Sequence, residues 1–216
     1  MCLVKNKLLI YDYLVGKLVD WDSEVQSCSK ERSLFNLTNV KLMKCLYAVC
    51  LMSVKDKKRL EDTLFGLFDK FYAYPKGPVE FETYNNKSIL LRYDLGYDES
   101  SKRLYLKKCD NFRTEQLIMF QLLDDKSVKP DDDTLNKEIN KNHLAEYAEM
   151  VDQSIVVLRK AKAFPKLNDV EALVELTHLD LWQEAYYSVN KRVDTRDLEK
   201  LQAECEKLRN IIHVEE

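Results

Sequence analysis

The chain has few of the residues that build phosphate loops and metal sites. It contains four glycines and three histidines in 216 residues, and the glycines are isolated from one another. No Gly-rich phosphate loop, no Gly-x-Ser-x-Gly elbow and no His-Glu-x-x-His motif can be formed from them. These absences argue against the enzyme classes that carry such motifs, and we expect neither a cofactor nor a metal.

The cysteines and the apolar runs give no sign of secretion or of a membrane span. Six cysteines are scattered without a Cys-x-x-Cys pair, which favours a reducing cytoplasm. The longest unbroken apolar run, Cys45–Met52, is far shorter than the roughly 20 residues of a membrane-spanning helix. The N-terminus is interrupted by lysines and has no small-residue cleavage site, so we expect no signal peptide, no membrane partner and a cytoplasmic location.

What the sequence does contain suits one helix-rich globular domain spanning residues 1–216. Hydrophobic residues make up 45% and charged residues 33% of the chain. The net charge of −3 gives no general basic field, which argues against nucleic acid as the main partner. Two basic stretches, Lys55–Arg59 and Lys102–Lys108, keep a nucleic-acid-binding transcriptional regulator open as the alternative.

The spacing of apolar residues predicts a mainly α fold. Helical periodicity indicates helices at about residues 3–19, 37–53, 61–72, 132–163, 170–177 and 195–212, with a further short helix around Trp182. Residues 88–93 and 103–107 are strand-like and flank a glycine-containing turn, while residues 114–123 fit either a helix or a third strand. We therefore predict a compact multi-helix domain with a small antiparallel β hairpin inserted after a Gly-Pro-Val corner.

That corner and the tyrosines are the most unusual features of the sequence. Of four glycines and four prolines, Pro75, Gly77 and Pro78 fall within one four-residue span, so the chain is forced to turn there. Twelve tyrosines exceed what a helical core needs, and tyrosine is enriched in protein interfaces. The predicted partner-binding residues combine the corner with a C-terminal aromatic group: Tyr72, Tyr74, Lys76, Trp182 and Tyr186.

A Cys–His nucleophile is the strongest enzymatic interpretation. Cys45 or Cys50 could meet His178, with Asp180 orienting the ring. Both cysteines lie in the most apolar predicted helix, where a thiol stays protonated and unreactive. We therefore expect no catalytic residue and no enzyme activity, and we interpret His143 as a hydrogen-bonded core residue of the long helix.

Three stretches, in order, resemble the Panacea (SocA-like) antitoxin domain of bacterial and phage toxin–antitoxin systems. The first match is a helix of the Leu-x-x-x-Lys-Leu-x-Lys-x-Leu-Tyr type. The second is an aromatic-Ala-aromatic stretch that runs into a Gly-Pro-Val corner, and the third is a Leu-x-x-Leu-Thr-His…Trp pattern. The matching residues are Leu37, Lys41, Leu42, Lys44, Leu46, Tyr47, Phe71, Ala73, Tyr74, Gly77, Pro78, Val79, Tyr84, Leu173, Leu176, Thr177, His178 and Trp182.

The resemblance implies a helical, type II antitoxin that neutralises a cognate protein toxin by binding it, without chemistry of its own. It implies mainly structural roles for the motif residues, with His178 as a hydrogen-bond hub at a helix end. The chain departs from the family pattern by an insertion at about 85–165 and a C-terminal helix at about 195–212. That helix has an apolar seam of about two heptads, which suits packing on the body or weak self-association. A phage-associated regulatory role is also compatible with the resemblance.

Overall fold

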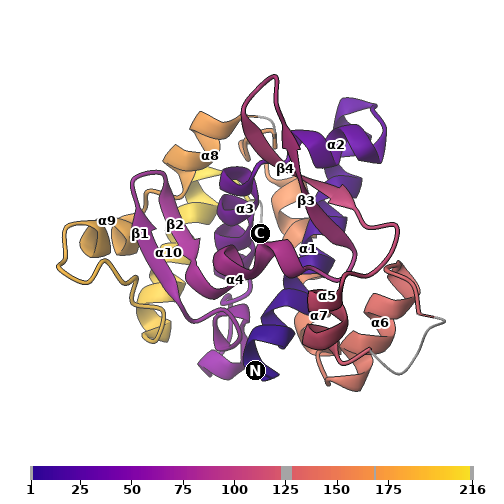
Figure 1. Ribbon diagram of the computed structural model, residues 1–216. Coiled ribbons are helices and arrows are strands. Elements are labelled where there is room, and N and C mark those ends of the chain that lie inside the picture. Colours follow the sequence, from indigo (N-terminus) through magenta and orange to yellow (C-terminus); the bar gives the residue numbers. More distant parts are fainter. Residues whose placement is uncertain (1, 123–127, 168, 215–216) are drawn as a thin grey trace. The chain divides into compact units, whose positions relative to one another are not determined.

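The computed structural model describes residues 2–122, 128–167 and 169–214. Within these residues the chain forms ten α-helices and two separate two-stranded antiparallel sheets (Figure 1). The predicted fold class, mainly α with a small β hairpin after the Gly-Pro-Val corner, is confirmed. The chain divides into two compact units: unit 1 comprises Met1–Asn39 and Glu82–Ala148, and unit 2 comprises Val40–Phe81 and Glu149–Glu216.

Unit 1 is built around the N-terminal helix and one hairpin. Its elements are α1 (Cys2–Gln26), α2 (Lys30–Asn36), α4 (Phe81–Asn86, within this unit from Glu82 onward), β3 (Tyr93–Asp98), β4 (Arg103–Lys108), α5 (Thr114–Phe120) and α6 (Asp132–Lys141). The strands β3 and β4 pair in register from Tyr93↔Lys108 to Asp98↔Arg103. The predicted hairpin is therefore confirmed, although its first strand begins at Tyr93 rather than Ser88.

A buried ion pair crosses unit 1. Asp12 of α1 is fully buried, and its carboxylate accepts twice from Arg92, from Nε at 2.6 Å and from the backbone N–H at 2.8 Å. Burial raises the pKa of the Asp12 carboxyl, and the charge of Arg92 counteracts part of that rise. Gly16 makes the arrangement sterically feasible, because a Cβ there would lie 2.6 Å from Nη2 of Arg92.

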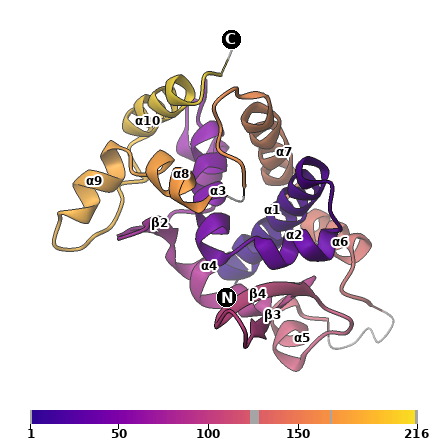
Figure 2. The ribbon, with the colours of Figure 1, turned by 90° about the horizontal axis from the view of Figure 1, so that it is seen from above.

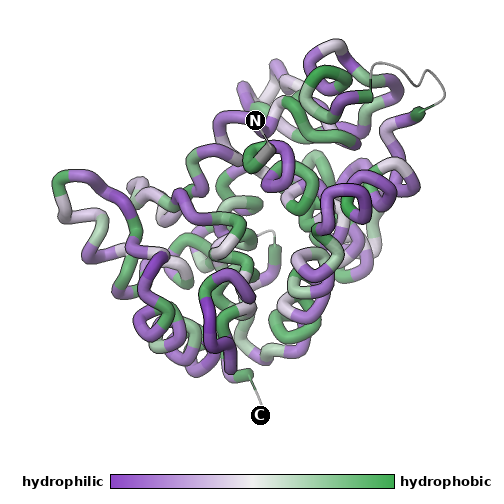
Figure 3. Tube along the Cα trace, turned by 90° about the horizontal axis from the view of Figure 1, so that it is seen from below, coloured by the Kyte–Doolittle hydropathy of each residue, from purple (hydrophilic) through white to green (hydrophobic). Residues whose placement is uncertain are grey.

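Unit 2 is organised around α3 (Asn39–Met52), which is buried from Lys41 to Met52. Its other elements are β1 (Phe71–Tyr74), β2 (Gly77–Glu80), α7 (Ala145–Lys160, within this unit from Glu149 onward), α8 (Val170–Leu176), α9 (Asp180–Tyr186) and α10 (Leu198–Ile211), several of which can be followed in Figure 2. Tyr47, Phe65 and Phe71 form a three-ring cluster with centroid distances of 5.3–6.2 Å. Figure 3 shows hydrophobic positions recurring between hydrophilic ones along the helical turns.

The predicted helix at 61–72 is wrong. The chain instead makes two short 3₁₀ turns, η1 (Leu60–Asp62) and η2 (Leu64–Gly66), and then enters β1. The hydroxyl of Thr63 donates to the carbonyl of Leu60 at 2.7 Å and accepts from the N–H of Phe65 at 3.1 Å. Such local side-chain bonds compete with the α-helical ladder.

The predicted long helix at 132–163 is two helices, α6 and α7. The break contains His143, whose backbone is left-handed with φ 56°. The side-chain amide of Asn142 donates to the carbonyl of Glu138 at 2.7 Å, which ends α6. His143 is exposed, so its interpretation as a core residue is also wrong.

The C-terminal helices are close to their predicted positions. Asp169 caps α8 by accepting from the N–H of Ala172, and residues 114–120 are helical rather than extended. The apolar seam of α10, Leu201, Cys205 and Leu208, is buried within the chain itself. This burial favours packing on the body over pairing between two chains.

Candidate partner-binding surface

The β1–β2 hairpin carries the corner that the sequence singled out. The strands pair from Phe71↔Glu80 to Tyr74↔Gly77, so Pro75 and Lys76 form the two-residue turn. The opposite side of β1 is paired with the chain after α9: Ala73 N–H donates to the carbonyl of Lys191 at 2.7 Å. Bonds on both sides of β1 hold its tyrosines in a fixed position.

Helix α9 packs beside β1 (Figure 1). The indole Nε1–H of Trp182 donates to the carbonyl oxygen of Tyr74 at 3.1 Å. At the start of α9, the carboxyl of Glu204 accepts from the N–H of Leu181 at 3.1 Å, and burial raises the pKa of Glu204 to about 7. Trp182 is only 8% exposed. It therefore anchors the neighbouring surface and contributes little contact area of its own.

Neighbouring aromatic rings stack on and beside Trp182. The imidazole of His178 stacks on the indole of Trp182 with centroids 3.8 Å apart, and Tyr186 stacks on Trp182 at 4.8 Å. Tyr187 meets Tyr186 edge-on at 5.4 Å, and the ammonium of Lys191 lies 5.2 Å from the Tyr186 ring centroid. Stacked rings lose little side-chain entropy when a partner binds, so these rings are pre-organised for contact.

We call five neighbouring residues of this region the aromatic surface. Three are exposed and two, Tyr72 and Tyr186, are half-buried; the full set is Tyr72, Tyr74, Tyr186, Tyr187 and Val189. Tyr74 is 44% and Tyr187 is 84% exposed, and Val189 is fully exposed. All five predicted partner-binding residues lie in unit 2. The predicted partner-binding set did not include Tyr187 and Val189. Val189 could have been predicted to be exposed, because it is an apolar residue between the polar residues Ser188 and Asn190.

The family-motif residues from three parts of the chain meet beneath the corner. The ammonium of Lys44 on α3 donates to the carbonyl of Pro78 at 2.8 Å. Gly77 has φ 94°, and a Cβ on it would lie 2.8 Å from Nζ of Lys44 and 2.9 Å from Oγ1 of Thr177. The matched helix, the corner and the Thr-His segment thus form one packed cluster. Lys44 belongs to this cluster but was not among the predicted site residues.

This cluster has unusual electrostatics. Lys44 is 1% exposed, and burial lowers its pKa to about 7. Burial, followed by the nearby charge of Lys44, lowers the pKa of His178. The hydroxyl of Thr177 donates to the carbonyl of Leu173 at 3.2 Å. Burial thus favours the neutral form of each group more than it is favoured in an exposed lysine or histidine.

The remaining motif residues have separate places. Leu42, Leu46 and Tyr47 are buried in α3, and Val79 is half-buried in β2. Tyr84 lies in α4 of unit 1, where the ammonium of Lys87 stands 3.5 Å from its ring centroid.

The residues of the two alternative functions are placed as follows. Cys45 and Cys50 are buried in α3, while the imidazole of His178 stacks on Trp182. Of the basic stretches, Lys55–Arg59 belongs to unit 2 and Lys102–Lys108 to unit 1. Arg59 pairs with Asp62 at 2.7 Å, and Arg103 donates to the carbonyl of Phe35 at 2.7 Å.

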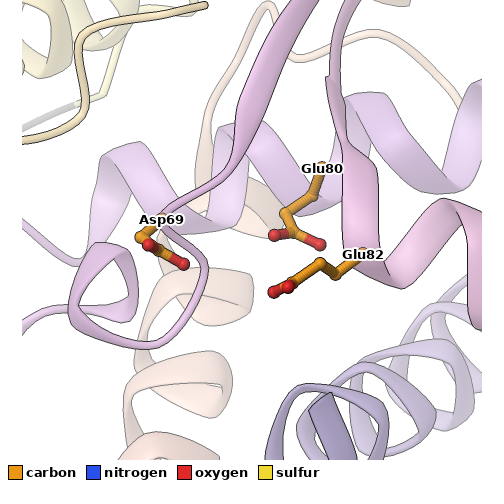
Figure 4. A group of neighbouring side chains, drawn as sticks. All are labelled: Asp69, Glu80 and Glu82. Atoms are coloured by element: carbon orange, nitrogen blue, oxygen red, sulfur yellow. The ribbon is translucent and has the colours of Figure 1, made fainter. Parts of the chain in front are cut away.

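Three acidic side chains near the hairpin are drawn in Figure 4. Asp69 precedes β1 and Glu80 ends β2, both in unit 2, and each has a polar partner. Glu82, in unit 1, accepts from the ammonium of Lys7 at 2.7 Å. Since these carboxylates are already engaged, we assign no metal to them.

Among the described residues, no single helix is long and apolar enough to cross a membrane. Only α2 and α3, taken as a bent pair, pass a test of length and composition.

Comparison with protein-family models, with curated proteins and with solved structures gives no match to this chain.

Proposed function

We propose that this protein is an antitoxin that binds a cognate protein toxin through the aromatic surface and masks the toxin's active region. The observation that carries the proposal is the pairing of a buried anchor with exposed rings. Trp182 is held by Tyr74 and His178, while Tyr74 and Tyr187 remain exposed beside it. Protein interfaces have this anatomy, with well-packed aromatic anchors and a more polar surrounding.

Two further features support the proposal. The motif residues that resemble the Panacea domain, Lys44, Gly77, Pro78 and Thr177, converge on one cluster directly beneath the hairpin. The positive groups Lys76 and Lys191 are exposed beside the rings and supply a polar rim. We place the protein in the cytoplasm, where the free thiols of Cys28, Cys45, Cys50, Cys109 and Cys205 would remain reduced.

A growth assay tests the proposal. The open reading frame next to the gene is induced alone, and then together with this protein. We expect growth arrest by the neighbour alone and relief on co-expression. Two results would overturn the assignment of that partner. Either the neighbouring gene product does not arrest growth, or its arrest of growth persists when this protein is fully expressed.

The same assay locates the surface. Tyr187→Ala removes a ring that is 84% exposed and should weaken neutralisation. Tyr97→Ala removes a ring of similar size that is 55% exposed in β3 of unit 1, so it serves as the matched control. Equal neutralisation by both variants and the unmodified chain would show that the toxin binds elsewhere.

A further inference from the structure

Three basic residues border the aromatic surface, which lies entirely in unit 2. Arg192 pairs with Tyr72 across an antiparallel β-bridge, so the two side chains project from the same face of the small sheet. The ammonium of Lys191 lies 5.2 Å from the ring centroid of Tyr186, a contact that leaves its positive charge in place. Lys76 is exposed in the turn of the β1–β2 hairpin. We call Lys76, Lys191 and Arg192 the basic rim.

The positive charge of the basic rim is not balanced by carboxylates beside it. Among the described residues, no carboxylate forms an ion pair with any of the three rim cations. Asp180, at the start of α9, pairs with Lys207 of α10, and is thus engaged outside the rim. Asp194 lies 3.9 Å from Arg196, which leaves Glu184 as the third carboxylate of residues 180–196. A chain with a net charge of −3 therefore carries a locally positive border around its exposed tyrosines.

Apolar and aromatic side chains accompany the rim cations. The ring of Tyr72 lies 5.6 Å from that of Phe81, which is 44% exposed. Val79 stands opposite Tyr72 in the hairpin and is half-buried, while Tyr187 and Val189 are exposed near α9. A nucleic acid is held mainly by many Lys and Arg contacts to successive phosphates. Three cations at the border of an apolar area match a protein partner better than a phosphate backbone.

We propose that the aromatic surface binds an acidic segment of the cognate toxin, in which carboxylates flank an apolar side chain. The inference rests on the proposed antitoxin function and adds the chemistry of the toxin segment. The guanidinium of Arg192, beside the ring of Tyr72, can engage a carboxylate through two parallel N–H groups. Carboxylates that face Lys76 and Lys191 act mainly on the rate of association, because exposed charges steer the encounter of two proteins.

Binding kinetics with the product of the neighbouring open reading frame test the inference. The association rate of the full chain should fall about tenfold or more when the ionic strength rises from about 0.01 M to about 1 M, because the Debye length shrinks from about 30 Å to about 3 Å. At low salt, the Lys76→Glu/Lys191→Glu double variant should associate about tenfold more slowly than the unmodified chain. Arg192→Gln should mainly raise the dissociation rate, because it removes the bidentate contact with a carboxylate.

A matched variant separates the rim from the charge of the whole chain. Lys58→Glu reverses a charge at an exposed loop position of unit 2 outside the aromatic surface, so it should leave both rates unchanged. Urea unfolding shows that each variant is folded.

The outcomes distinguish this inference from the proposed function. If Tyr187→Ala weakens the complex while the rim variants leave both rates unchanged, or if Lys58→Glu slows association as much as a rim substitution, the inference is overturned and the antitoxin proposal stands. Binding of a DNA duplex in place of the gene product, weakened in the rim variants, would overturn the inference in favour of nucleic acid. Binding of neither one would overturn the proposed function, and the inference with it.

Discussion

The indole of Trp182 and the backbone of Tyr74 are joined by a hydrogen bond of 3.1 Å between residues 108 positions apart in the sequence. This bond couples α9 to the hairpin that contains the Pro-Gly-Pro corner. It places a nearly buried tryptophan directly behind exposed tyrosines. Stability and partner binding should therefore respond differently to substitutions on the two sides of this bond.

Trp182→Phe should lower the free energy of unfolding by about 1–3 kcal/mol. The smaller ring removes the Nε1–H donor to Tyr74 and part of the stack between His178 and Tyr186. Urea denaturation measures the change. Tyr187→Ala is the control and should alter stability by less than about 0.5 kcal/mol, because that ring is exposed. Equal losses in both variants would contradict the anchor role of Trp182.

Gly77→Ala should destabilise the protein by more than about 1 kcal/mol. Its φ of 94° is unfavourable for a residue with a Cβ, and that Cβ would lie 2.8 Å from Nζ of Lys44. Thermal and urea unfolding report the loss, with the adjacent exposed Lys76→Ala as the control. A stability unchanged by Gly77→Ala would show that the corner does not require this backbone conformation.

Lys44 should make stability rise with pH above neutrality. Its pKa is about 7 in the folded protein and 10.5 in its ordinary state, so between these values the unfolded chain binds a proton that the folded chain does not. The free energy of unfolding should therefore increase by up to about 1.4 kcal/mol per pH unit from pH 7 to 9, relative to Lys44→Met. Parallel stability curves for the two proteins would show that Lys44 remains charged when folded.

Asp12→Asn should cost about 3–5 kcal/mol, because it removes the buried counter-charge of Arg92 and leaves only the exposed carboxylate of Asp132 paired with the guanidinium. Arg59→Gln breaks the exposed Arg59–Asp62 pair and should cost less than about 1 kcal/mol. Urea denaturation of the two variants shows how much more a buried ion pair contributes to stability than an exposed one. A small loss for Asp12→Asn would mean that water or the carboxylate of Asp132 balances the charge of Arg92.

Local periodicity was sufficient to predict α3 and α10. The apolar residues of both helices recur at helical spacing, and both helices formed close to the predicted positions, although α3 is buried on every face from Lys41 to Met52. Periodicity failed where short-range bonds override it. The hydroxyl bonds of Thr63 favour 3₁₀ turns in place of the predicted helix, and the left-handed backbone of His143 interrupts the predicted long helix.

The sequence predicted most residues of the candidate site, but it did not predict how they are arranged in space. Tyr72 and Tyr74 are adjacent in the sequence to the corner, whereas their relation to Trp182 depends on how β1 and α9 pack. Nothing in the sequence around Lys44 indicates that it would be buried, since lysines at helical spacing are usually solvated. The structure explains how the Lys44 side chain is accommodated: Gly77 has no Cβ to clash with it, and the carbonyl of Pro78 accepts its hydrogen bond.

The most direct measurement is the affinity of this protein for the product of the neighbouring open reading frame, determined by co-purification and calorimetry. The account predicts a stable complex with the unmodified chain, and a loss of affinity of about thirtyfold or more in the Tyr74→Ala/Tyr187→Ala double variant. The Tyr97→Ala control, in unit 1, should retain full affinity. Unchanged affinity in the double variant, with folding intact, would contradict the assignment of the aromatic surface as the toxin-binding site.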